Sequence, residues 1–300
     1  MSYRIVGDWG TSRLRLFRIE DDRIVARGDG PGIGTLDGTP EAALRAAVAP
    51  WRAAGDPQSI ALCGMVGSRN GWAEVPYVAC PADAATWLAG ATQLSLDAVP
   101  VTIMAGLVCT APSGGPDVMR GEETQLFGAI ALDPVLARGR HRIGLPGTHS
   151  KWATIEDGRI VAFQTFFTGE LFALLRDGST LLRAAASGAI DDADEAAGFA
   201  HGLARASEGE RLIGALFEAR SAQLIDARSP SWATGYLSGL LIGREIAELA
   251  PAPGETVSLI GDPRLAARYD RALAARGIAA TLLDGDACAL AGLALLETVA

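Results

Sequence analysis

The sequence has few cysteines, no basic tract and no long apolar run. Its four cysteines contain no C-x-x-C pair and have no histidine at ligand spacing, which argues against a zinc site or a disulfide framework. No apolar run reaches the roughly 18 residues of a membrane span. The N-terminus lacks the basic and apolar regions of a signal peptide. We therefore expect a cytoplasmic protein with no membrane partner.

Positive charge is scarce and unevenly composed. The formal net charge is −9, and no Lys/Arg stripe is present, so a nucleic-acid partner is not expected. Of the 26 basic residues, 25 are arginine and the other is Lys151. Because lysine and arginine are not equivalent at phosphate-contacting positions, Lys151 is a candidate phosphate ligand. The alternative is that Lys151 is an ordinary surface lysine in a chain that otherwise uses arginine.

One pattern occurs twice along the chain. Alternating apolar and polar residues predict a meander of three strands, Tyr3–Trp9, Arg13–Ile19 and Arg23–Ala26. The meander returns over His141–Ala162, where IEDGRIVA matches the earlier IEDDRIVA at seven of eight positions. These copies begin at positions 19 and 155, too far apart for a solenoid repeat, and they indicate two copies of one domain core.

The remaining segments are mostly helical. Spacing of apolar residues predicts helices at Pro40–Ala54, Gly169–Ala186, Ala193–Ala206, Glu208–Ala227, Ser231–Ala250, Arg264–Arg276 and Ala287–Val299. Further strands are predicted at Ser59–Cys63, Thr256–Ile260 and Ile278–Leu283, and strand–helix alternation near the C-terminus indicates parallel pairing. A change in composition after Leu132 predicts domains 1–132 and 133–286, with a C-terminal helix at 287–300 that packs on the first.

Each copy of the meander carries a Gly-Thr pair at a turn, Gly10-Thr11 and Gly147-Thr148. Glycine permits a tight turn with exposed N–H groups and threonine adds a hydroxyl, so each turn can bind phosphate oxygens. Facing each other across a cleft, two such turns could hold a triphosphate. An isolated charge at Asp8, within a buried strand, is costly unless it reaches a Mg²⁺ ion. Arg15 and Lys151 could neutralise phosphate charge.

Competing nucleotide and hydrolase signatures do not fit. Lys151 is not part of G-x-x-x-x-G-K-[ST]. The glycine-rich run Gly28–Gly34 does not match G-x-G-x-x-G at the start of a helix, and G-x-S-x-G is absent.

Six strings in order, GDWGTSRLR, GMVGSRNGW, MRGEETQLFGA, PGTHSKW, TGEL and LSGLLIG, resemble the 2-dehydro-3-deoxygalactonokinase family of the sugar-kinase, heat-shock-chaperone and actin superfamily. The resemblance implies an α/β fold of two actin-like ATPase domains, each a ribonuclease H-like duplicate, with ATP in an interdomain cleft. It implies Mg²⁺-dependent transfer of the γ-phosphoryl group to the C6 hydroxyl of 2-dehydro-3-deoxy-D-galactonate. The first domain would bind sugar acid and phosphate, and the second the nucleotide.

The same resemblance assigns nucleotide ligands. Its two phosphate loops correspond to Gly10-Thr11 and Gly147-Thr148. Ser12 and His149 beside these turns, with Arg15 and Lys151 as cations, are further candidate phosphate ligands. Gly261 falls at the adenosine loop, where this chain has Gly-Asp instead of two glycines.

Phosphoryl transfer also needs a carboxylate that accepts the hydroxyl proton. Glu122 and Glu123 follow Gly121 at a predicted helix start, and we favour Glu122 slightly as the base. The alternative is that both acids only complement the helix dipole.

The acceptor is itself an acid, so its carboxylate needs a forked cation. Arg69 and Arg120 lie in family-specific strings, with Ser68 beside the first; either arginine could instead be a solvated surface residue. Trp72 is an apolar wall of the sugar pocket or a loop anchor. Glu170 binds sugar hydroxyls or caps the next helix.

Two other functions stay open on the sequence. One is a phosphoanhydride hydrolase of the same superfamily, and the other is a non-catalytic, nucleotide-gated binding protein. The oligomeric state, with a homodimer as one candidate, is also open, because buried helices and interface helices have similar sequences.

Overall fold

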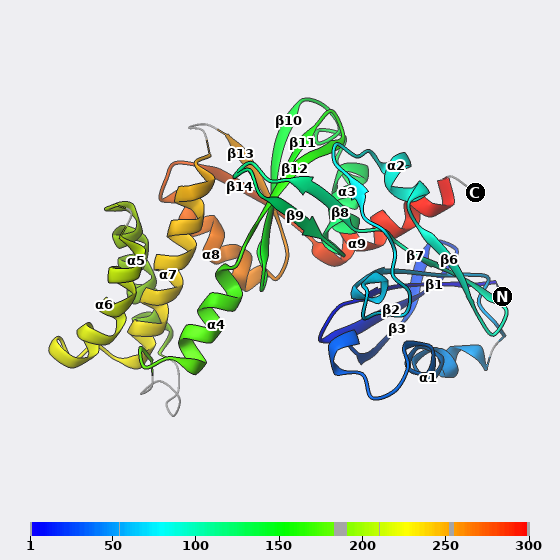
Figure 1. The fold of residues 1–300 in the computed structure, drawn as a ribbon, viewed down its shortest axis with the longest axis horizontal. Helices are drawn as coiled ribbons and strands as arrows, with labels where there is room; N and C mark the ends of the chain where they lie inside the picture. The colour runs from blue at the N-terminus through cyan, green and yellow to red at the C-terminus, as the bar shows by residue number, and fades with distance from the viewer. Residues whose placement is uncertain (1, 54, 183–190, 210, 252–254, 299–300) are drawn as a thin grey trace. The chain divides into compact units, whose positions relative to one another are not determined.

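The computed structural model describes residues 2–53, 55–182, 191–209, 211–251 and 255–298. The chain forms two compact units (Figure 1). The first comprises Met1–His141, Ala153–Gln164 and Asp284–Ala300, and the second comprises Arg142–Trp152 and Thr165–Leu283. Both ends of the chain therefore belong to the first unit. The sequence boundary after Leu132 stays a prediction.

A six-stranded sheet forms the centre of the first unit. Its strands lie in the order β3 (Arg23–Pro31), β2 (Arg13–Glu20), β1 (Arg4–Trp9), β4 (Ile60–Gly64), β7 (Val99–Ile103) and β6 (Thr92–Leu96). β1 pairs antiparallel with β2 and parallel with β4. All five residues of β4 are buried, as expected for a central strand that is covered on both faces.

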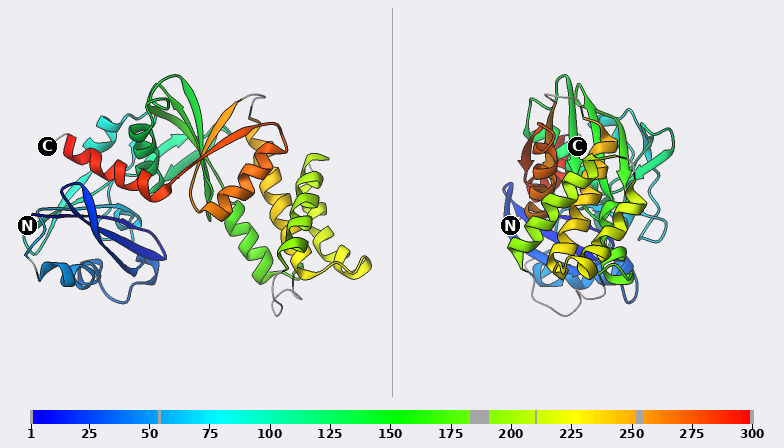
Figure 2. Two further views of the ribbon diagram at one scale, coloured as in Figure 1. Left: turned by 180° about the vertical axis from the view of Figure 1, so that it is seen from behind. Right: turned by 90° about the vertical axis from the view of Figure 1, so that its left-hand side faces the viewer.

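Smaller elements complete this unit. They are the three-stranded sheet of β5 (Val78–Ala79), β8 (Leu107–Thr110) and β9 (Pro116–Met119), the helices α1 (Pro40–Arg52), α2 (Ala84–Ala89), α3 (Glu122–Leu132) and α9 (Gly285–Ala294), and the 3₁₀ turns η1 (Ile33–Thr35), η2 (Met65–Gly67) and η4 (Leu295–Thr298). α9 packs closely against α3 (Figure 2), since a Cβ at Gly128 would lie 1.8 Å from the Cys288 carbonyl oxygen.

The second sheet repeats the strand order of the first. It runs β12 (Arg159–Phe166), β11 (Ser150–Glu156), β10 (Arg140–Leu145), β13 (Thr256–Ile260) and β14 (Ala279–Leu283). β13 pairs parallel with both β10 and β14, which confirms the predicted parallel pairing near the C-terminus.

The repeated octapeptide forms the same hairpin turn in both copies. Asp21 and Asp22 have φ of 45° and 59°, and Asp157 and Gly158 have φ of 47° and 76°. Two successive residues with positive φ give the turn whose twist matches antiparallel strands. Aspartate and glycine tolerate this backbone, which explains why the two copies kept these residue types at their turns.

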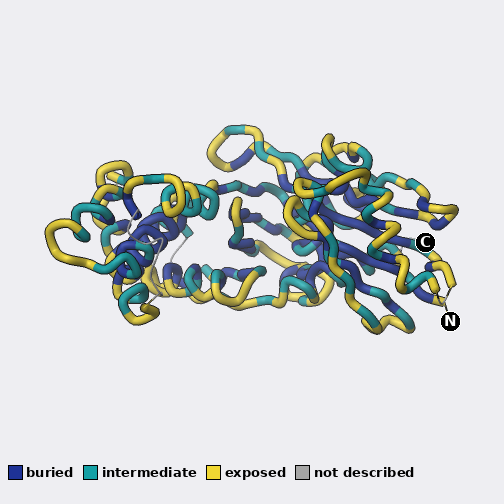
Figure 3. The backbone as a smooth tube through the Cα atoms, turned by 90° about the horizontal axis from the view of Figure 1, so that it is seen from below, coloured by how far each residue is buried: buried dark blue, intermediate teal, exposed yellow. Residues whose placement is uncertain are grey.

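Among its described residues, the second unit has five helices: α4 (Thr168–Gly178), α5 (Asp192–Ser207), α6 (Leu212–Ile225), α7 (Pro230–Leu249) and α8 (Pro263–Ala274). α5 and α7 approach to backbone contact. A Cβ at Gly239, within the LSGLLIG string, would lie 2.1 Å from the Phe199 carbonyl oxygen, and one at Gly202 would lie 2.2 Å from that of Tyr236. The glycines are therefore needed for packing, and the inner face of α7 is buried (Figure 3).

The predicted elements differ from the structure at several ends. β3 continues to Pro31 instead of Ala26, because it pairs with the whole of β2. α4 ends at Gly178 rather than Ala186, and part of that predicted segment lies outside the described residues. α6 begins at Leu212 instead of Glu208, after Gly209 takes a φ of 138°. Within the described ranges, no helix combines the length and apolar character needed to cross a membrane.

Candidate functional site

The first part of the site lies where two parallel strands end. Asp8 and Gly64 are at the carboxyl ends of β1 and β4, which are neighbours in the sheet. Gly64 has φ of 92°, and a Cβ there would lie 3.0 Å from Asp8 Oδ1. A Cβ at Gly121, just before α3, would in turn lie 3.3 Å from Gly64 Cα. Glycine at 64 leaves space beside Asp8 Oδ1, and glycine at 121 allows the start of α3 to approach Gly64.

Asp8 has a partner on the adjacent strand. It is opposite Arg15 in the β1–β2 register, and Arg15 Nη2 lies 2.5 Å from Asp8 Oδ2. The other terminal nitrogen of Arg15 lies 2.7 Å from Asp286 Oδ1 at the start of α9. Arg15 thus compensates the charge of Asp8 within the sheet. The contact of Arg15 with phosphate stays a prediction.

The first Gly-Thr turn is shaped by the glycine-rich run that follows it. The Gly10 N–H donates to the Arg13 carbonyl oxygen at 3.0 Å, which closes the turn, and Thr11 and Ser12 are exposed. A Cβ at Gly32 would lie only 2.3 Å from the Thr11 carbonyl oxygen. The glycines after β3 therefore serve close packing against the turn rather than dinucleotide binding.

The two glutamates at the start of α3 lie in different surroundings. The Arg120 N–H donates to Glu122 Oε2 at 3.1 Å, and the Gly121 N–H donates to Glu123 Oε2 at 2.7 Å. Glu123 is fully buried and Glu122 is half-buried. Burial, and then the neighbouring Glu122 charge, raise the pKa of Glu123 to about 8. Of the two, only Glu122 is accessible to a substrate hydroxyl here.

Arg120 and Ser68 carry polar atoms without partners. The Arg120 guanidinium lies 4.3 Å from the Tyr77 ring centroid and donates from Nη2 to the Val75 carbonyl oxygen at 2.8 Å. Among the described residues, its buried Nε and Nη1 and the buried Ser68 Oγ have no hydrogen-bond partner. A Cβ at Gly67 would lie 3.0 Å from Arg120 Nη1. Arg120 therefore approaches the loop at the residue that precedes Ser68. Buried polar atoms without partners are rare, so both side chains retain unused hydrogen-bonding capacity.

Two other predicted substrate ligands lie elsewhere on this loop. The Arg69 side chain is 84% exposed, and its nearest described acidic partner is Glu74 at 3.4 Å. Trp72 is half-buried, and its backbone N–H donates to the Val66 carbonyl oxygen at 2.8 Å. Their roles in binding stay predictions.

The second unit contains a cavity of about 1230 Å³. Its lining comes from the second Gly-Thr turn, the start of α4, the inner face of α7 and the start of α8, including Gly147, Thr168, Ser238, Asp262, Arg268 and Tyr269. Gly261, directly before Asp262, has φ of 150°, and a Cβ there would lie 3.2 Å from the Pro146 carbonyl oxygen. The ends of the parallel strands β10 and β13 thus meet at this cavity, which is large enough for a small-molecule ligand.

The residues after Gly147 are partly buried. Lys151 is 5% exposed, and its Nζ lies 3.4 Å from the His149 carbonyl oxygen, so the surface-lysine alternative is wrong. The His149 ring is hydrogen-bonded to Glu170 and stacks on Phe167, with ring centroids 5.5 Å apart. Glu170 is therefore positioned beside the second Gly-Thr turn, and contacts of these side chains with phosphate or sugar stay predictions.

Sequence reasoning missed a buried glutamate behind this cavity. Glu245 of α7 is 2% exposed and accepts hydrogen bonds from the side chains of Ser150, Trp152 and Tyr269. Burial raises the pKa of Glu245, and the hydrogen bonds oppose the rise. An acidic residue in register with the apolar face of this helix, two residues after LSGLLIG, is the signal that could have revealed it.

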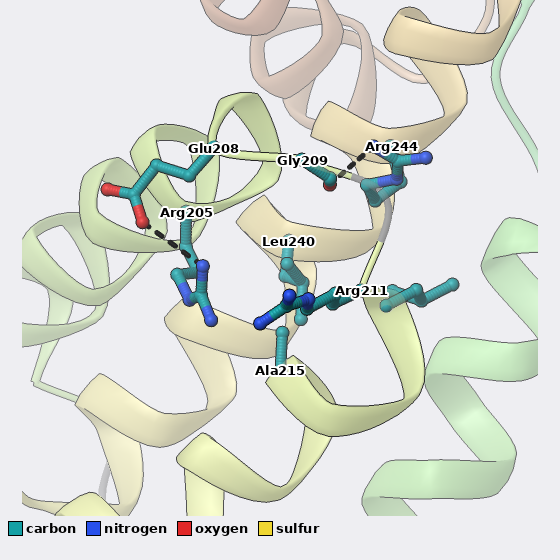
Figure 4. A pocket seen from close by; sticks show the side chains of 8 residues that line it. Arg205, Glu208, Gly209, Arg211, Ala215, Leu240 and Arg244 are labelled. Atoms are coloured by element: carbon teal, nitrogen blue, oxygen red, sulfur yellow. Dashed lines mark hydrogen bonds and ion pairs between the residues drawn. The ribbon is translucent and has the colours of Figure 1, made fainter.

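A smaller cavity of about 340 Å³ lies among α5, α6 and α7 (Figure 4). Arg205 and Arg244 line it, but Arg205 is paired with Glu208 and Glu218, and Arg244 donates to the Gly209 carbonyl oxygen at 2.8 Å. None of the predicted site residues lines this cavity.

Comparison with known proteins decides the family. The family model described as 2-keto-3-deoxy-galactonokinase matches residues 8–296. The chain belongs to this family. It is 37% identical over 305 residues to a Rhizobium meliloti (strain 1021) protein assigned as 2-dehydro-3-deoxygalactonokinase DgoK1, covering 97% of this chain and 95% of that one.

Solved structures agree with the family. A crystal structure of a protein assigned as 2-dehydro-3-deoxygalactonokinase from Sinorhizobium meliloti is similar with a TM-score of 0.86 and 33% identity, covering 99% of both chains. The activator of the 2-hydroxyisocaproyl-CoA dehydratase from Clostridium difficile, solved with bound ADPNP, is similar with a TM-score of 0.53 and 13% identity, covering 99% of this chain and 95% of that one. The latter similarity concerns the fold alone. The predicted fold class, an α/β chain of the two-domain actin-like ATPase kind, is confirmed.

Proposed function

We propose that this member of the 2-keto-3-deoxy-galactonokinase family transfers the γ-phosphoryl group of ATP to the 6-hydroxyl of 2-dehydro-3-deoxy-D-galactonate, a step in sugar-acid breakdown. The observation that carries the acceptor assignment is the Arg120 guanidinium, whose buried Nε and Nη1 have no hydrogen-bond partner among the described residues. A guanidinium forms strong charge-assisted hydrogen bonds with carboxylates, so the carboxylate of a sugar acid is the partner we propose for Arg120.

In this proposal Glu122 accepts the proton of the 6-hydroxyl as the new phosphate ester bond forms. Glu122 directly follows Arg120 and Gly121 at the start of α3, so an acceptor held by Arg120 lies within its reach. Glu123, with a pKa of about 8, is protonated at neutral pH and adds no second negative charge next to the base. A positioned base of this kind contributes about 10²–10⁴-fold to the rate.

The nucleotide is proposed to bind in the cavity of the second unit. The Gly147-Thr148 turn offers backbone N–H groups to phosphate, and Lys151 provides positive charge behind them. Gly261 and the start of α8 form the adenosine side. These assignments are supported by the lining of the cavity by Gly147 and Asp262.

Asp8 is the proposed protein ligand for Mg²⁺. Glycine at 64 leaves space beside its Oδ1. In the described part of the chain, no group of three or more acidic, histidine or cysteine side chains could hold a metal. Mg²⁺ commonly takes one or two carboxylates and completes its coordination with phosphate and water, so a single aspartate fits. When bound, Mg²⁺ would neutralise phosphate charge.

Kinase-family membership does not favour a phosphoanhydride hydrolase or a nucleotide-gated binding protein. ADP release, measured by a coupled assay, should therefore depend on the sugar acid and be higher with the galactonate epimer than with the gluconate epimer. ATP turnover of equal rate with and without acceptor would contradict the proposal. The proposed function includes a cytoplasmic location, because ATP is the donor and the four cysteines are free thiols.

For the assembly, we propose a homodimer through α6. Its Ile213, Phe217 and Leu224 are 81, 58 and 62% exposed, and apolar side chains gathered in this way are typical of protein interfaces. An antiparallel second copy that places Ile213 on Leu224 also places Phe217 on Arg220, a favourable cation–aromatic pair. Sedimentation should give a dimer that Phe217→Glu converts to a monomer. The control Leu174→Glu, on α4, should leave the dimer intact.

A further inference from the structure

The buried Glu245 connects four elements of the second unit. Ser150 Oγ donates to Glu245 Oε1 at 2.9 Å and Trp152 Nε1 donates to the same atom at 2.7 Å. Tyr269 OH donates to Oε2 at 2.8 Å, and Thr168 adds a side-chain hydrogen bond. The donors come from β11, α4 and α8, and the acceptor from α7, so one carboxylate links all four elements.

Each of these donors borders the proposed nucleotide site. Thr168 and Tyr269 line the cavity of about 1230 Å³. Ser150 and Trp152 flank Lys151 on β11, directly after the second Gly-Thr turn. Glu245 itself is not among the residues that line the cavity, so its influence on a bound nucleotide must pass through these neighbours.

The turn and the start of α4 are in close contact. The Glu170 N–H donates to the Thr148 carbonyl oxygen at 2.8 Å, and a Cβ at Gly169 would lie 2.2 Å from the Gly147 carbonyl oxygen. There is thus no room for α4 to shift without moving the turn. A group that fixes Thr168 and Ser150 together therefore fixes Gly147 and Thr148 between them.

A carboxylate is a costly way to fill a core position. Apolar side chains of similar volume often stabilise a fold as well or better than buried charged groups. A buried polar group whose hydrogen bonds are satisfied instead holds its partners in one arrangement. Because four donors converge on Glu245, its carboxylate is better explained by the arrangement that it imposes on these donors than by a gain in stability.

We infer that Glu245 is a positioning residue that holds the second Gly-Thr turn and the start of α4 in the arrangement required for nucleotide binding. The inference rests on the proposed function for the identity of the ligand as a nucleotide, and it assigns Glu245 no contact with that ligand.

The test compares Glu245→Gln with Glu218→Gln. Glu218 is a matched control in the same unit, because it also accepts a tyrosine hydroxyl, from Tyr236 at 2.7 Å, and lies outside the lining of the nucleotide cavity. For each variant, KM for ATP, KM for the sugar acid, the ADP dissociation constant by calorimetry and the melting temperature are measured, with kinetics well below melting.

Glu245→Gln should raise both KM for ATP and the ADP dissociation constant by about tenfold or more, since at least one donor loses its charged acceptor. KM for the sugar acid should stay within about twofold, as Arg120 and Glu122 belong to the other unit. Trp152→Phe removes a single donor and should shift ADP affinity in the same direction by a smaller factor. Glu218→Gln should lower only the melting temperature.

Unchanged ADP affinity in Glu245→Gln would overturn the inference, even if the variant melts earlier. An equal rise in both KM values would also overturn it, because that pattern indicates general loss of structure. If the wild type binds ADP but does not phosphorylate the sugar acid, the proposed function fails while the ADP measurements still decide the role of Glu245.

Discussion

Replacing Arg120 with methionine should separate substrate binding from stability. In the structure the Nε and Nη1 atoms of Arg120 are buried without a partner among the described residues, and we propose that this guanidinium binds the substrate carboxylate. A charge-assisted hydrogen bond contributes about 1.5–3 kcal/mol. Losing the guanidinium contact should therefore cost about 3 kcal/mol, or roughly a hundredfold in kcat/KM for the sugar acid. Arg120→Lys keeps the charge without the planar guanidinium and should lose about tenfold.

The assay is coupled ADP detection with two acceptors, the sugar acid and its neutral C1 amide. The amide lacks the negative charge, so Arg120→Met should reduce kcat/KM much less for the amide than for the acid. KM for ATP should not change, because the nucleotide cavity belongs to the second unit. Equal losses on acid and amide would refute the assignment of Arg120 to the carboxylate.

Thermal unfolding provides an independent measure of the same variant. Arg120→Met removes two desolvated nitrogens, each of which costs about 1–3 kcal/mol in the folded state. It also removes the hydrogen bond to the Val75 carbonyl oxygen and the contact over Tyr77, each worth about 1 kcal/mol. The melting temperature should therefore stay the same or rise by a few degrees while activity falls. A large drop in melting temperature with activity retained would show that Arg120 is structural.

Glu122→Gln should lower kcat by about 10²–10⁴-fold with ADP affinity unchanged, and full activity in this variant would exclude Glu122 as the base. Glu123 has a folded pKa raised to about 8 from 4.5 by burial, so its contribution to stability is present below pH 4.5 and is lost as pH rises through about 8. Glu123→Gln should remove this decline from a series of melting curves, and an unchanged slope would show that Glu123 is not its source. Gly128→Ala should destabilise α3 against α9 by about 3 kcal/mol or more in denaturant unfolding, because the Cβ would lie 1.8 Å from the Cys288 carbonyl oxygen. Gly178→Ala, where nothing lies within 4 Å, is its control and should be neutral or slightly stabilising.

Local patterns were strong enough to predict the repeated meander. Alternating segments predicted these strands, and the Asp-Asp and Asp-Gly pairs predicted the two hairpin turns, since few residue types tolerate two successive positive φ values. The short strands β5, β8 and β9 were not predicted. Each has only two to four residues, and they are stabilised by one another rather than by their own sequence.

Both the sequence and the tertiary structure were needed to identify the candidate site. The sequence by itself determined the duplicated cores, the family strings and the candidate site residues, because turn chemistry and strand period act over a few neighbouring residues. Only the tertiary structure decided that Glu123 is buried while Glu122 is accessible, that Arg120 has unpartnered nitrogens while Arg69 is exposed, and that Glu245 joins four elements. Burial and hydrogen-bond satisfaction arise from residues far apart in the chain, so no local pattern carries them.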